Sequence, residues 1–497
     1  MIRYTEHQLQ DAEFRKKLKS LGFKVNKKLR CYQAKPTLLV KVGLGLPIDL
    51  SSPQNVTEDF LMPYQVKDIV KMVQQKSMLN ANDMGLGKTL EAIMYTKYMG
   101  FTKPILVVAP KTALGGWKQE ILKWGGGTED QVNIIQGSKK QKEVKVKDIV
   151  NSKFTLINYE ILQDIPQNIE FDCIIADEAH RIKNHKAKRT KLIKKLKATH
   201  RLALTGTPIQ NKVDELWSIF DFIDPTIFGA SYFSFVYRFC DCYMGAYAME
   251  IKGATKNPRN IKLLHDILSL KMIRHKKKDV LKELPDKQYC NIEIEMTKEQ
   301  EAKYKEVKKE VLVEIEASGE KLDVSLALTK ILRLQQITSC PTGFWKLKEN
   351  PKIDMMLDLF EQTDSKFIVF SRFSTTIDEI QSTLEANNIR FARVTGNTKD
   401  RQKEVDKFQE DPSIKVFIAT IRGAGEAITL TKADKVIMFD REWSPAMNQQ
   451  AEDRCHRKGQ KNAVTIYNLI CPKTIDTKLE KTLGMKVTEI KKMLEEE

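Results

Sequence analysis

Three short segments carry residue types and spacings that suit phosphate chemistry. The first, NDMGLGKT at residues 82–89, places Gly85, Gly87, Lys88 and Thr89 between an apolar stretch and a helical one. Glycines let backbone N–H groups face phosphates, a lysine supplies positive charge to the β- and γ-phosphates, and a threonine hydroxyl can bind Mg²⁺. The strict pattern G-x4-GK[ST] fails because Asn82 stands where its first glycine would be, so an ordinary turn is an alternative for this segment alone.

The second segment is the acidic pair Asp177 and Glu178, which directly follows the apolar run CIIA. Ligands of open α/β sheets bind at the carboxyl ends of the strands, where this pair is expected. An aspartate there can hold Mg²⁺ through water, and a neighbouring glutamate can orient and deprotonate an attacking water. A helix N-terminus that favours acidic residues is the alternative explanation.

The third segment is QAEDRCHRKGQ at residues 450–460. Arg454 and Arg457 lie three residues apart, so on a helix they would share a face. Positive groups supplied from a second domain stabilise charge on a γ-phosphoryl group during transfer. A basic helix on the solvated surface is the alternative for this segment taken alone.

Short apolar runs must position these residues. Runs that are apolar at every position, rather than at every second one, suit strands buried on both faces of a parallel sheet. They occur in two blocks, at 105–109, 154–158, 172–177 and 201–205 and then at 366–371, 391–395, 415–420, 435–439 and 464–470. The sequence therefore predicts two α/β domains.

The stretches around these blocks suggest where the domains divide. Residues 212–350 have helical spacing with few strand signals, and ELPDKQY at 283–289 places a proline in a polar setting typical of a linker. The predicted organisation is an accessory segment at 1–50, a first lobe at 51–282 with a helical insertion at about 212–282, a linker at 283–295, a second lobe at 296–475 with a helical insertion at about 296–350, and a C-terminal helix at 476–497.

Composition indicates a globular protein with a polyanionic partner. The 497 residues include 83 Lys and Arg against 65 Asp and Glu, a formal net charge of +18, and 41% are hydrophobic. No apolar run approaches the ~18 residues of a membrane helix, and the first residues have no apolar core of a secretory signal. The eight cysteines include no C-x2-C pair. We therefore expect an intracellular protein with buried thiols, no membrane partner and no structural zinc.

Together these segments resemble the Swi/Snf-related ATPases of helicase superfamily two, in the order expected for that family. NDMGLGKT is similar to the family's DEMGLGKT, and the match in QAEDRCHRKGQ is the most specific of all. Further similar segments are MPYQ (62–65), VVAPKTALGGWKQEILKW (107–124), INYE (157–160), DEAHRIKN (177–184), LTGTPIQN (204–211), MIRHKKKDVLKELPDK (272–287) and VFSRF (369–373). The resemblance covers about residues 55–475.

The resemblance implies two RecA-like lobes with helical protrusions and ATP clamped between them, in a motor that tracks along double-stranded DNA. It implies that Lys88, Gly85, Gly87 and Thr89 bind ATP and Mg²⁺, that Asp177 holds Mg²⁺, and that Glu178 is the catalytic base. By the same resemblance, Arg454 and Arg457 contact the γ-phosphoryl and Gln65 reads adenine. Coupling of hydrolysis to lobe movement is expected of Thr205, Gly206, Thr207 and Gln450, and DNA contact of Lys111, Tyr159, Arg372 and Thr420.

Two departures from the family pattern matter. Asn82-Asp83 replaces the family's Asp-Glu, which should be tolerated because neither residue is the phosphate lysine. The string ATIRGAGEAITL at 419–430 places Glu426 near the expected boundary of DNA and nucleotide. This string, and GFKVNKKLRCYQA at 22–34, resemble the annealing-helicase and fork-remodelling branch, in a compact form like bacterial or viral members.

Basic residues are dense after the DEAH segment. Along a helix they could follow a DNA backbone, or they could form a solvated face. They are Arg181, Lys183, Lys186, Lys188, Arg189, Lys191, Lys194, Lys195 and Lys197. With no recognition module in the sequence, DNA binding should read backbone and shape more than bases.

The resulting hypothesis is an ATP-dependent translocase on double-stranded or branched DNA, a monomeric motor that remodels forks in repair, recombination or replication. It would work where the DNA is, in the bacterial nucleoid or a eukaryotic nucleus. A remover or remodeller of DNA-bound proteins that acts with a protein partner is one alternative. A strand-separating helicase and an ATP-controlled DNA clamp with negligible turnover are two others.

Overall fold

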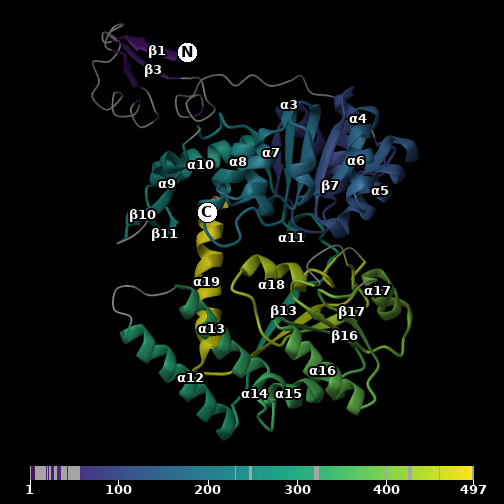
Figure 1. Ribbon diagram of the computed structural model, residues 1–497, viewed down its shortest axis with the longest axis vertical. Helices are drawn as coiled ribbons and strands as arrows, with labels where there is room; N and C mark the ends of the chain where they lie inside the picture. The colour runs from purple at the N-terminus through teal and green to yellow at the C-terminus, as the bar shows by residue number, and fades with distance from the viewer. Residues whose placement is uncertain are drawn as a thin grey trace. The chain divides into compact units, whose positions relative to one another are not determined.

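The computed structural model describes residues 58–494 except 230, 246–248, 318–323, 399, 424–427 and 458. Before residue 58 it describes only 2–5, 18, 21, 24–26, 31–34, 42 and 56. The chain forms two compact units (Figure 1), residues 1–276 with 488–497 and residues 277–487. The division at Lys276/Lys277 comes earlier than the predicted linker at 283–295, and most of that stretch forms a strand of the second unit.

The first unit contains a seven-stranded sheet in the order β12-β4-β9-β8-β5-β7-β6, in which every pairing is parallel. Its strands are β4 (Met78–Asn80), β5 (Ile105–Ala109), β6 (Val132–Ile134), β7 (Phe154–Asn158), β8 (Glu170–Asp177), β9 (Lys197–Leu204) and β12 (Met272–Ile273). The four predicted strands of this block are confirmed as β5, β7, β8 and β9.

Helices cover both faces of this sheet because its strands are apolar on both faces. Alternate residues of β5 enter two separate cores: Leu106 and Val108 pack with α7, α8, α9 and α10, whereas Ile105 and Val107 pack with α3, α4 and α5. The helices are α3 (Pro63–Gln75), α4 (Lys88–Met99), α5 (Leu114–Lys123), α6 (Lys139–Lys147), α7 (Lys188–Lys195), α8 (Glu215–Ile223), α9 (Tyr232–Phe239) and α10 (Pro258–Lys271).

Two smaller sheets complete the first unit. The insertion after β9 is helical as predicted, but it also contains an antiparallel hairpin of β10 (Cys240–Met244) and β11 (Met249–Ala254). Near the N-terminus, β1 (Ile2–Thr5), β2 (Lys24–Asn26) and β3 (Cys31–Ala34) form an antiparallel sheet in the order β1-β3-β2. Most of the predicted accessory segment at 1–50 lies outside the described residues.

The second unit repeats the parallel architecture with six strands in the order β13-β18-β17-β14-β16-β15. They are β13 (Lys287–Glu293), β14 (Lys366–Ser371), β15 (Phe391–Val394), β16 (Val416–Thr420), β17 (Ala433–Met438) and β18 (Val464–Ile470). All five runs predicted for this block are strands. The first strand, β13, was expected to be linker, and it pairs along its whole length with β18.

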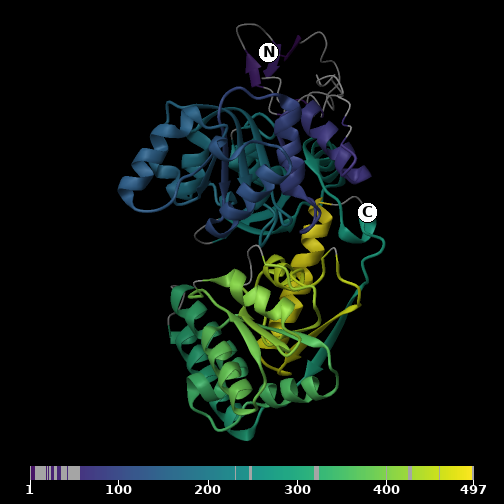
Figure 2. The ribbon, with the colours of Figure 1, turned by 90° about the vertical axis from the view of Figure 1, so that its right-hand side faces the viewer.

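Helices also cover both faces of the second sheet (Figure 2). Ile368 and Phe370 of β14 pack with α17 and α18, whereas Phe367 and Val369 pack with α15 and α16. The helices of this unit are α11 (Lys277–Val280), α12 (Lys298–Ala317), α13 (Val324–Ser339), α14 (Pro341–Trp345), α15 (Pro351–Glu361), α16 (Ser374–Ala386), α17 (Arg401–Glu410), α18 (Pro445–Glu452) and α19 (Ile475–Leu494), of which the part from 488 on belongs to the first unit. No helix in the described ranges is long and apolar enough to cross a membrane.

Candidate nucleotide-binding and DNA-facing sites

The predicted phosphate loop joins β4 to α4 at the carboxyl edge of the first sheet. Gly85 and Gly87 both adopt positive φ, 84° and 82°, which side chains disfavour. A Cβ on Gly87 would also lie 2.4 Å from Nε2 of Gln65. The positive φ therefore favours glycine at 87, and a side chain there would also displace the amide of Gln65. Gly87 precedes the first turn of α4, as an anion site requires.

Lys88 begins α4 and turns back over the loop. Its Nζ donates to the carbonyls of Asn82 at 2.7 Å and Asp83 at 3.1 Å. Burial lowers the pKa of Lys88, while the nearby carboxylates of Glu178 and Asp177 oppose that change. The ammonium is thus held by two neutral carbonyls, which a phosphate anion would outcompete.

Gln65, the predicted adenine reader, lies against the phosphate loop. Its Nε2 and the hydroxyl of Tyr64 both donate to the carbonyl of Leu86, at 3.2 and 2.9 Å, and its Oε1 accepts from Met62 N at 3.0 Å. The segment at 62–65 therefore closes one side of the loop. In this structure the side-chain amide of Gln65 is hydrogen-bonded to backbone atoms of Met62 and Leu86.

Asp177 ends β8 and Glu178 follows it in a left-handed conformation, φ 50° and ψ 52°. For a non-glycine residue this conformation costs about 1 kcal/mol or more and is common at active sites. Burial raises the pKa of Asp177 to about 6, the charge of Glu178 adds to this, and Trp117 and Lys88 oppose it. Trp117 does so by donating from Nε1 to Asp177 Oδ2 at 2.8 Å.

The predicted coupling segment Thr205–Thr207 lies next to both acids and the loop. Thr205 N donates to Asn80 O at 3.0 Å, and a Cβ on Gly206 would lie 3.0 Å from Met84 Cγ. His180 Nδ1 lies 3.4 Å from Thr205 Oγ1 and 3.2 Å from Glu178 Oε2. One imidazole therefore connects the predicted base to the coupling segment.

The predicted shared helical face of Arg454 and Arg457 is wrong. Helix α18 ends at Glu452, and both arginines follow it in turns and bends. Arg454 is 1% exposed, whereas Arg457 is half-buried and donates to Asp453 O at 3.1 Å and Thr429 Oγ1 at 3.1 Å. Spacing alone could not locate the end of α18. Gln450, also predicted to couple, lies on α18 and is 7% exposed.

Asp453 holds this turn in place within the second unit. Its carboxylate pairs with Lys287 at 2.7 Å and Lys277 at 3.0 Å. Next to it, His456 Nε2 lies 2.7 Å from Pro285 O, and its own carbonyl accepts from Lys277 Nζ at 2.8 Å. Residues 277–287, which follow the division between the two units, are therefore bound to the turn that carries Arg454 and Arg457.

The four residues predicted to contact DNA differ in exposure. Lys111 is exposed at the start of a short 3₁₀ helix after β5. Tyr159 is 2% exposed and donates to Asp177 O at 2.6 Å, and Thr420 is 8% exposed and accepts from Gly423 N at 3.0 Å. In this conformation Tyr159 and Thr420 are thus buried, and they make hydrogen bonds at the carboxyl ends of β8 and β16.

Arg372 shares a carboxylate with a second arginine. Glu442, 3% exposed, contacts Arg372 Nε at 3.3 Å and Arg422 Nε at 2.8 Å. The side chain of Arg422 is 67% exposed and that of Arg372 is 21% exposed. Glu442 therefore holds two guanidinium groups. The exposed one, of Arg422, follows β16, and the more buried one, of Arg372, follows β14.

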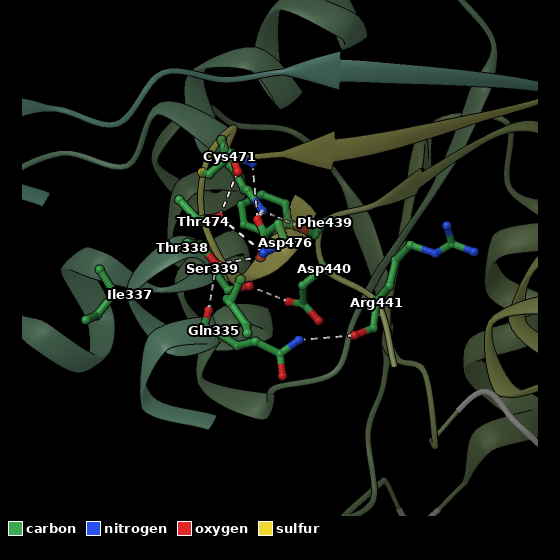
Figure 3. A network of polar contacts seen from close by, with 12 residues as sticks. Gln335, Ile337, Thr338, Ser339, Phe439, Asp440, Arg441, Cys471, Thr474 and Asp476 are labelled. Carbon is green, nitrogen blue, oxygen red and sulfur yellow. Dashed lines mark hydrogen bonds and ion pairs between the residues drawn. The ribbon is translucent and has the colours of Figure 1, made fainter. Parts of the chain in front are cut away.

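A polar network at Asp440 holds the end of α13 (Figure 3), where Ser339 Oγ donates to Asp440 Oδ2 at 2.8 Å. Asp440 also positions Arg372, since Ser371 Oγ donates to its Oδ2 at 2.5 Å and Arg372 N donates to its Oδ1 at 2.6 Å. Gln335 on α13 accepts from Arg372 Nη1 at 2.7 Å through Oε1. The helical insertion is thereby bound to the carboxyl end of the second sheet.

The basic segment after the DEAH motif is divided between internal contacts and solvent. Only Lys188–Lys195 forms a regular helix, α7. Lys183 pairs with Glu215 at 2.9 Å and Lys194 with Asp221 at 2.7 Å, so these two cations serve the fold. The exposed members are Lys186, Lys188, Arg189, Lys191, Lys195 and Lys197.

Sequence reasoning missed Trp117, Asp453 and Glu442. Trp117 and Asp453 lie inside segments that carried the family resemblance, but their partners are distant in sequence and no local spacing identifies them. Glu442 pairs with residues about 20 and 70 positions away, which only the fold brings together.

Comparison with known proteins agrees with this geometry. The model of the SNF2-related domain matches residues 24–342, and that of the helicase conserved C-terminal domain matches residues 351–459. The chain belongs to the SNF2-related family. It thus carries the two domains of an SNF2-type ATPase, and Lys88 and Glu178 lie in the first match and Arg454 and Arg457 in the second.

Among its relatives is the ISWI chromatin-remodeling complex ATPase ISW1 of Saccharomyces cerevisiae, 30% identical over 455 residues, which are 84% of this chain and 39% of that protein. The lymphoid-specific helicase of Homo sapiens is 26% identical over 530 residues, 88% of this chain and 63% of that protein. The chain spans about two fifths of the length of the first relatives it matches. The Sulfolobus solfataricus SWI2/SNF2 ATPase core in complex with dsDNA is 28% identical, with a TM-score of 0.42 over 90% of this chain and 100% of that one.

Proposed function

We propose that this SNF2-related chain is a DNA-stimulated ATPase that hydrolyses ATP with Mg²⁺. The observation that carries this proposal is the convergence of the loop lysine and the acidic pair at one sheet edge. The carboxylates of Glu178 and Asp177 both act on the pKa of the half-buried Lys88. Lys88 would bind the β- and γ-phosphates, Thr89 and Asp177 the metal, and Glu178 the attacking water.

The residues present fit Mg²⁺ and a nucleotide. Asp177 is a half-buried carboxylate with a raised pKa, which a divalent cation would lower by its charge. No group of three or more His, Cys, Asp or Glu side chains in the described part of the chain is placed to hold a metal. Mg²⁺ bound to nucleotide commonly needs only one or two carboxylates, because phosphates and water fill the other positions. When bound, the ion would neutralise charge that develops on the phosphoryl oxygens.

The proposed hydrolysis uses residues of both units. Glu178 would take the proton from water, and Lys88 would stabilise the phosphoryl charge from the first unit. Arg454 and Arg457 would supply further positive charge to the transition state. Gln65 would exchange its contact with Leu86 O for the adenine edge, and Thr205, Gly206, Thr207 and Gln450 would respond to the change in the γ-phosphate.

We further propose that hydrolysis drives movement along double-stranded DNA, with branched or forked DNA as the preferred substrate. The net charge of +18 and the exposed lysines on and around α7 support a polyanionic partner. Arg422 and Lys111 are exposed cations that could contact phosphates. Fork remodelling itself rests on the sequence resemblance in residues 419–430 and 22–34.

Displacement or remodelling of DNA-bound proteins, with a partner, is a second candidate function. It is favoured by the relatives, several of which are named as ATPases of chromatin-remodeling complexes. Naked branched DNA would then stimulate turnover no more than plain duplex does.

One experiment separates these functions. ATP turnover is measured at one fixed salt concentration with no nucleic acid, single strands, plain duplex, a fork and a four-way junction, with Glu178→Gln as the control for contaminating ATPase. Stimulation by duplex, and more by fork or junction, is the expected result. Equal stimulation by duplex and fork would favour protein displacement, and stimulation by single strands alone would favour a strand-separating helicase. No stimulation by any DNA would contradict the proposal.

A further inference from the structure

A closed polar cluster lies directly beneath the phosphate loop and is centred on Asn82, which is fully buried. Asn82 Nδ2 donates to Asp68 Oδ2 at 2.9 Å and to Glu91 Oε2 at 3.2 Å. Its Oδ1 accepts from His275 N at 2.8 Å, and its backbone N donates to Asn80 Oδ1 at 3.1 Å. Both polar side-chain atoms of Asn82 thus have partners, and these partners come from three separate segments.

Two of those partners are buried acids. Glu91 is 0% exposed and Asp68 is 4% exposed, and burial raises the pKa of both carboxyl groups. Asn80 Nδ2 donates to Glu91 Oε2 at 2.5 Å, and His275 Nε2 lies 2.9 Å from Asp68 Oδ1. An amide at position 82 is therefore the donor that both acids share, and a buried acid without a donor is costly.

The same cluster joins the phosphate loop to residues 273–275, which come just before the chain passes into the second unit. Ala81 N donates to Ile273 O at 2.7 Å, and Asp83 N donates to His275 O at 3.0 Å. Together with the bond from His275 N to Asn82, these make a continuous ladder between residues 81–83 and 273–275. The first unit gives way to the second at Lys276/Lys277, directly after this ladder.

We propose that Asn82 is a positioning residue, which sets the phosphate loop for nucleotide by sharing its amide between Asp68 and Glu91 while holding His275. The proposal rests on the proposed function for the identity of the ligand. When a phosphate draws Lys88 Nζ away from the carbonyls of Asn82 and Asp83, the two residues that lose this contact are those bonded to His275. Nucleotide binding is thus transmitted to the chain at the end of the first unit.

The hydrogen bonds from the Asn82 amide to two acids also account for asparagine at a position where the family has aspartate. Aspartate at 82, as in the family's DEMGLGKT, would here place a third carboxylate against Asp68 and Glu91 in a fully buried cluster. Like charges at this spacing cannot all ionise, and the shared donor would be lost. Exchanging the two groups, with the acid at 82 and the amide at 91, would restore a donor and an acceptor.

The test compares Asn82→Asp, Glu91→Gln and the double variant Asn82→Asp/Glu91→Gln. ADP affinity is measured by calorimetry and stability by thermal unfolding. We expect Asn82→Asp to weaken ADP binding at least tenfold and the double variant to recover to within threefold of the wild type. Asn133→Asp is the matched control, because Asn133 is a 9% exposed asparagine of the same unit whose Nδ2 donates to Lys145 O. It should lower the unfolding temperature without changing ADP affinity.

Hydrogen exchange supplies a second readout, which a purely structural role would not move. ADP should slow exchange of the backbone amides in residues 272–276 in the wild type but not in Asn82→Asp. Wild-type ADP affinity in Asn82→Asp, or a double variant no better than the single one, would overturn the proposal. A wild-type chain that binds no ADP would overturn the proposed function instead. In that case unfolding temperatures still test whether residues 82 and 91 form an acid–amide pair. A double variant that regains the unfolding temperature lost in Asn82→Asp supports this pair, and one that does not regain it refutes the pair.

Discussion

Asp453 and Lys287 form a buried ion pair of 2.7 Å that binds the turn after α18 to the first strand of the second sheet. Lys277 adds a second cation at 3.0 Å, and the side chains of all three residues are at most 13% exposed. Burial by itself would raise the pKa of Asp453, but Lys287 and Lys277 together lower it to about 2. Asp453, together with Glu452, which pairs with Lys287 at 3.2 Å, therefore binds the turn that carries Arg454 and Arg457 to residues 277–287.

Replacing Asp453 by Asn should destabilise the protein, because Lys277 and Lys287 would both lose this carboxylate and Lys287 would keep Glu452, at 3.2 Å, as its acidic partner. We expect a loss of about 3 kcal/mol in the free energy of unfolding, measured by urea denaturation of the second unit's transition. The matched control is Asp364→Asn, since Asp364 is fully exposed and pairs with Lys415 on the surface at 3.0 Å. That change should stay within about 0.5 kcal/mol, and equal losses in the two variants would contradict the role given to Asp453.

Stability should also fall in acid through Asp453. Its folded pKa of about 2 lies below the unfolded value of ~3.9, so the ionised form contributes about 2 kcal/mol that is present above pH ~4. This contribution is lost as the pH falls from ~4 toward 2, when the carboxylate takes up a proton. The slope of unfolding free energy against pH over this range should flatten in Asp453→Asn and stay unchanged in Asp364→Asn.

At Mg²⁺ concentrations that do not saturate the site, turnover should decline below about pH 6, because Asp177 must be ionised to take up the metal and the pKa of its metal-free carboxyl is about 6. Trp117→Phe removes the indole donor that lowers this pKa, so the acid limb should move to higher pH. Pre-steady-state ATP hydrolysis at low Mg²⁺ measures the effect. An acid limb that stays in place in Trp117→Phe would show that Asp177 does not set it.

Lys88→Ala and Glu178→Gln should each lower ATP turnover by about 10²–10⁴-fold, since one removes phosphate charge and the other the general base. The two should differ in nucleotide binding, because Glu178 has no predicted contact with the phosphates in the ground state. Glu178→Gln should keep ATP affinity and Lys88→Ala should lose it, as calorimetry would show. Duplex DNA binding should survive in both, and substantial turnover in either would contradict the site.

Arg457→Ala should reduce the hydrolysis rate on the order of 10³-fold while changing ATP affinity much less, as expected for a group that acts on the transition state. Single-turnover kinetics with saturating ATP separates the two quantities. Lys461→Ala is the control, because Lys461 is an exposed cation close by in the chain. A parallel loss of affinity and rate in Arg457→Ala would assign it to ground-state binding.

Arg422→Ala should weaken duplex binding similarly for all sequences and reduce the slope of log K against log salt by about 1, as for the loss of one phosphate contact. The exposed guanidinium held by Glu442 is the reason. Arg390→Ala serves as the control, since Arg390 is 62% exposed and pairs with Asp411 on the same unit. An unchanged salt slope in Arg422→Ala would place the DNA elsewhere.

The sequence predicted the strands well because their burial on both faces leaves a local mark. The runs 105–109 and 366–371 are apolar at nearly every position, and both became central strands of parallel sheets. The strand β13 was missed because it is an edge strand with four consecutive exposed residues and lacks such a run. The end of α18 was missed because the contacts of Asp453 and His456 that shape it come from residues 277–287.

By itself, then, the sequence determined the two-sheet architecture, the phosphate loop, the acidic pair and membership of the family, since each depends on residues close together in the chain. Only the tertiary structure decided which of the predicted DNA-facing residues are buried, where the two arginines lie, and which residues surround Asn82. Those outcomes depend on pairs such as Asn82 with His275 and Asp453 with Lys287, whose members are more than 150 residues apart. Local patterns carry no record of such partners, because burial and hydrogen bonding between them exist only once the chain has folded.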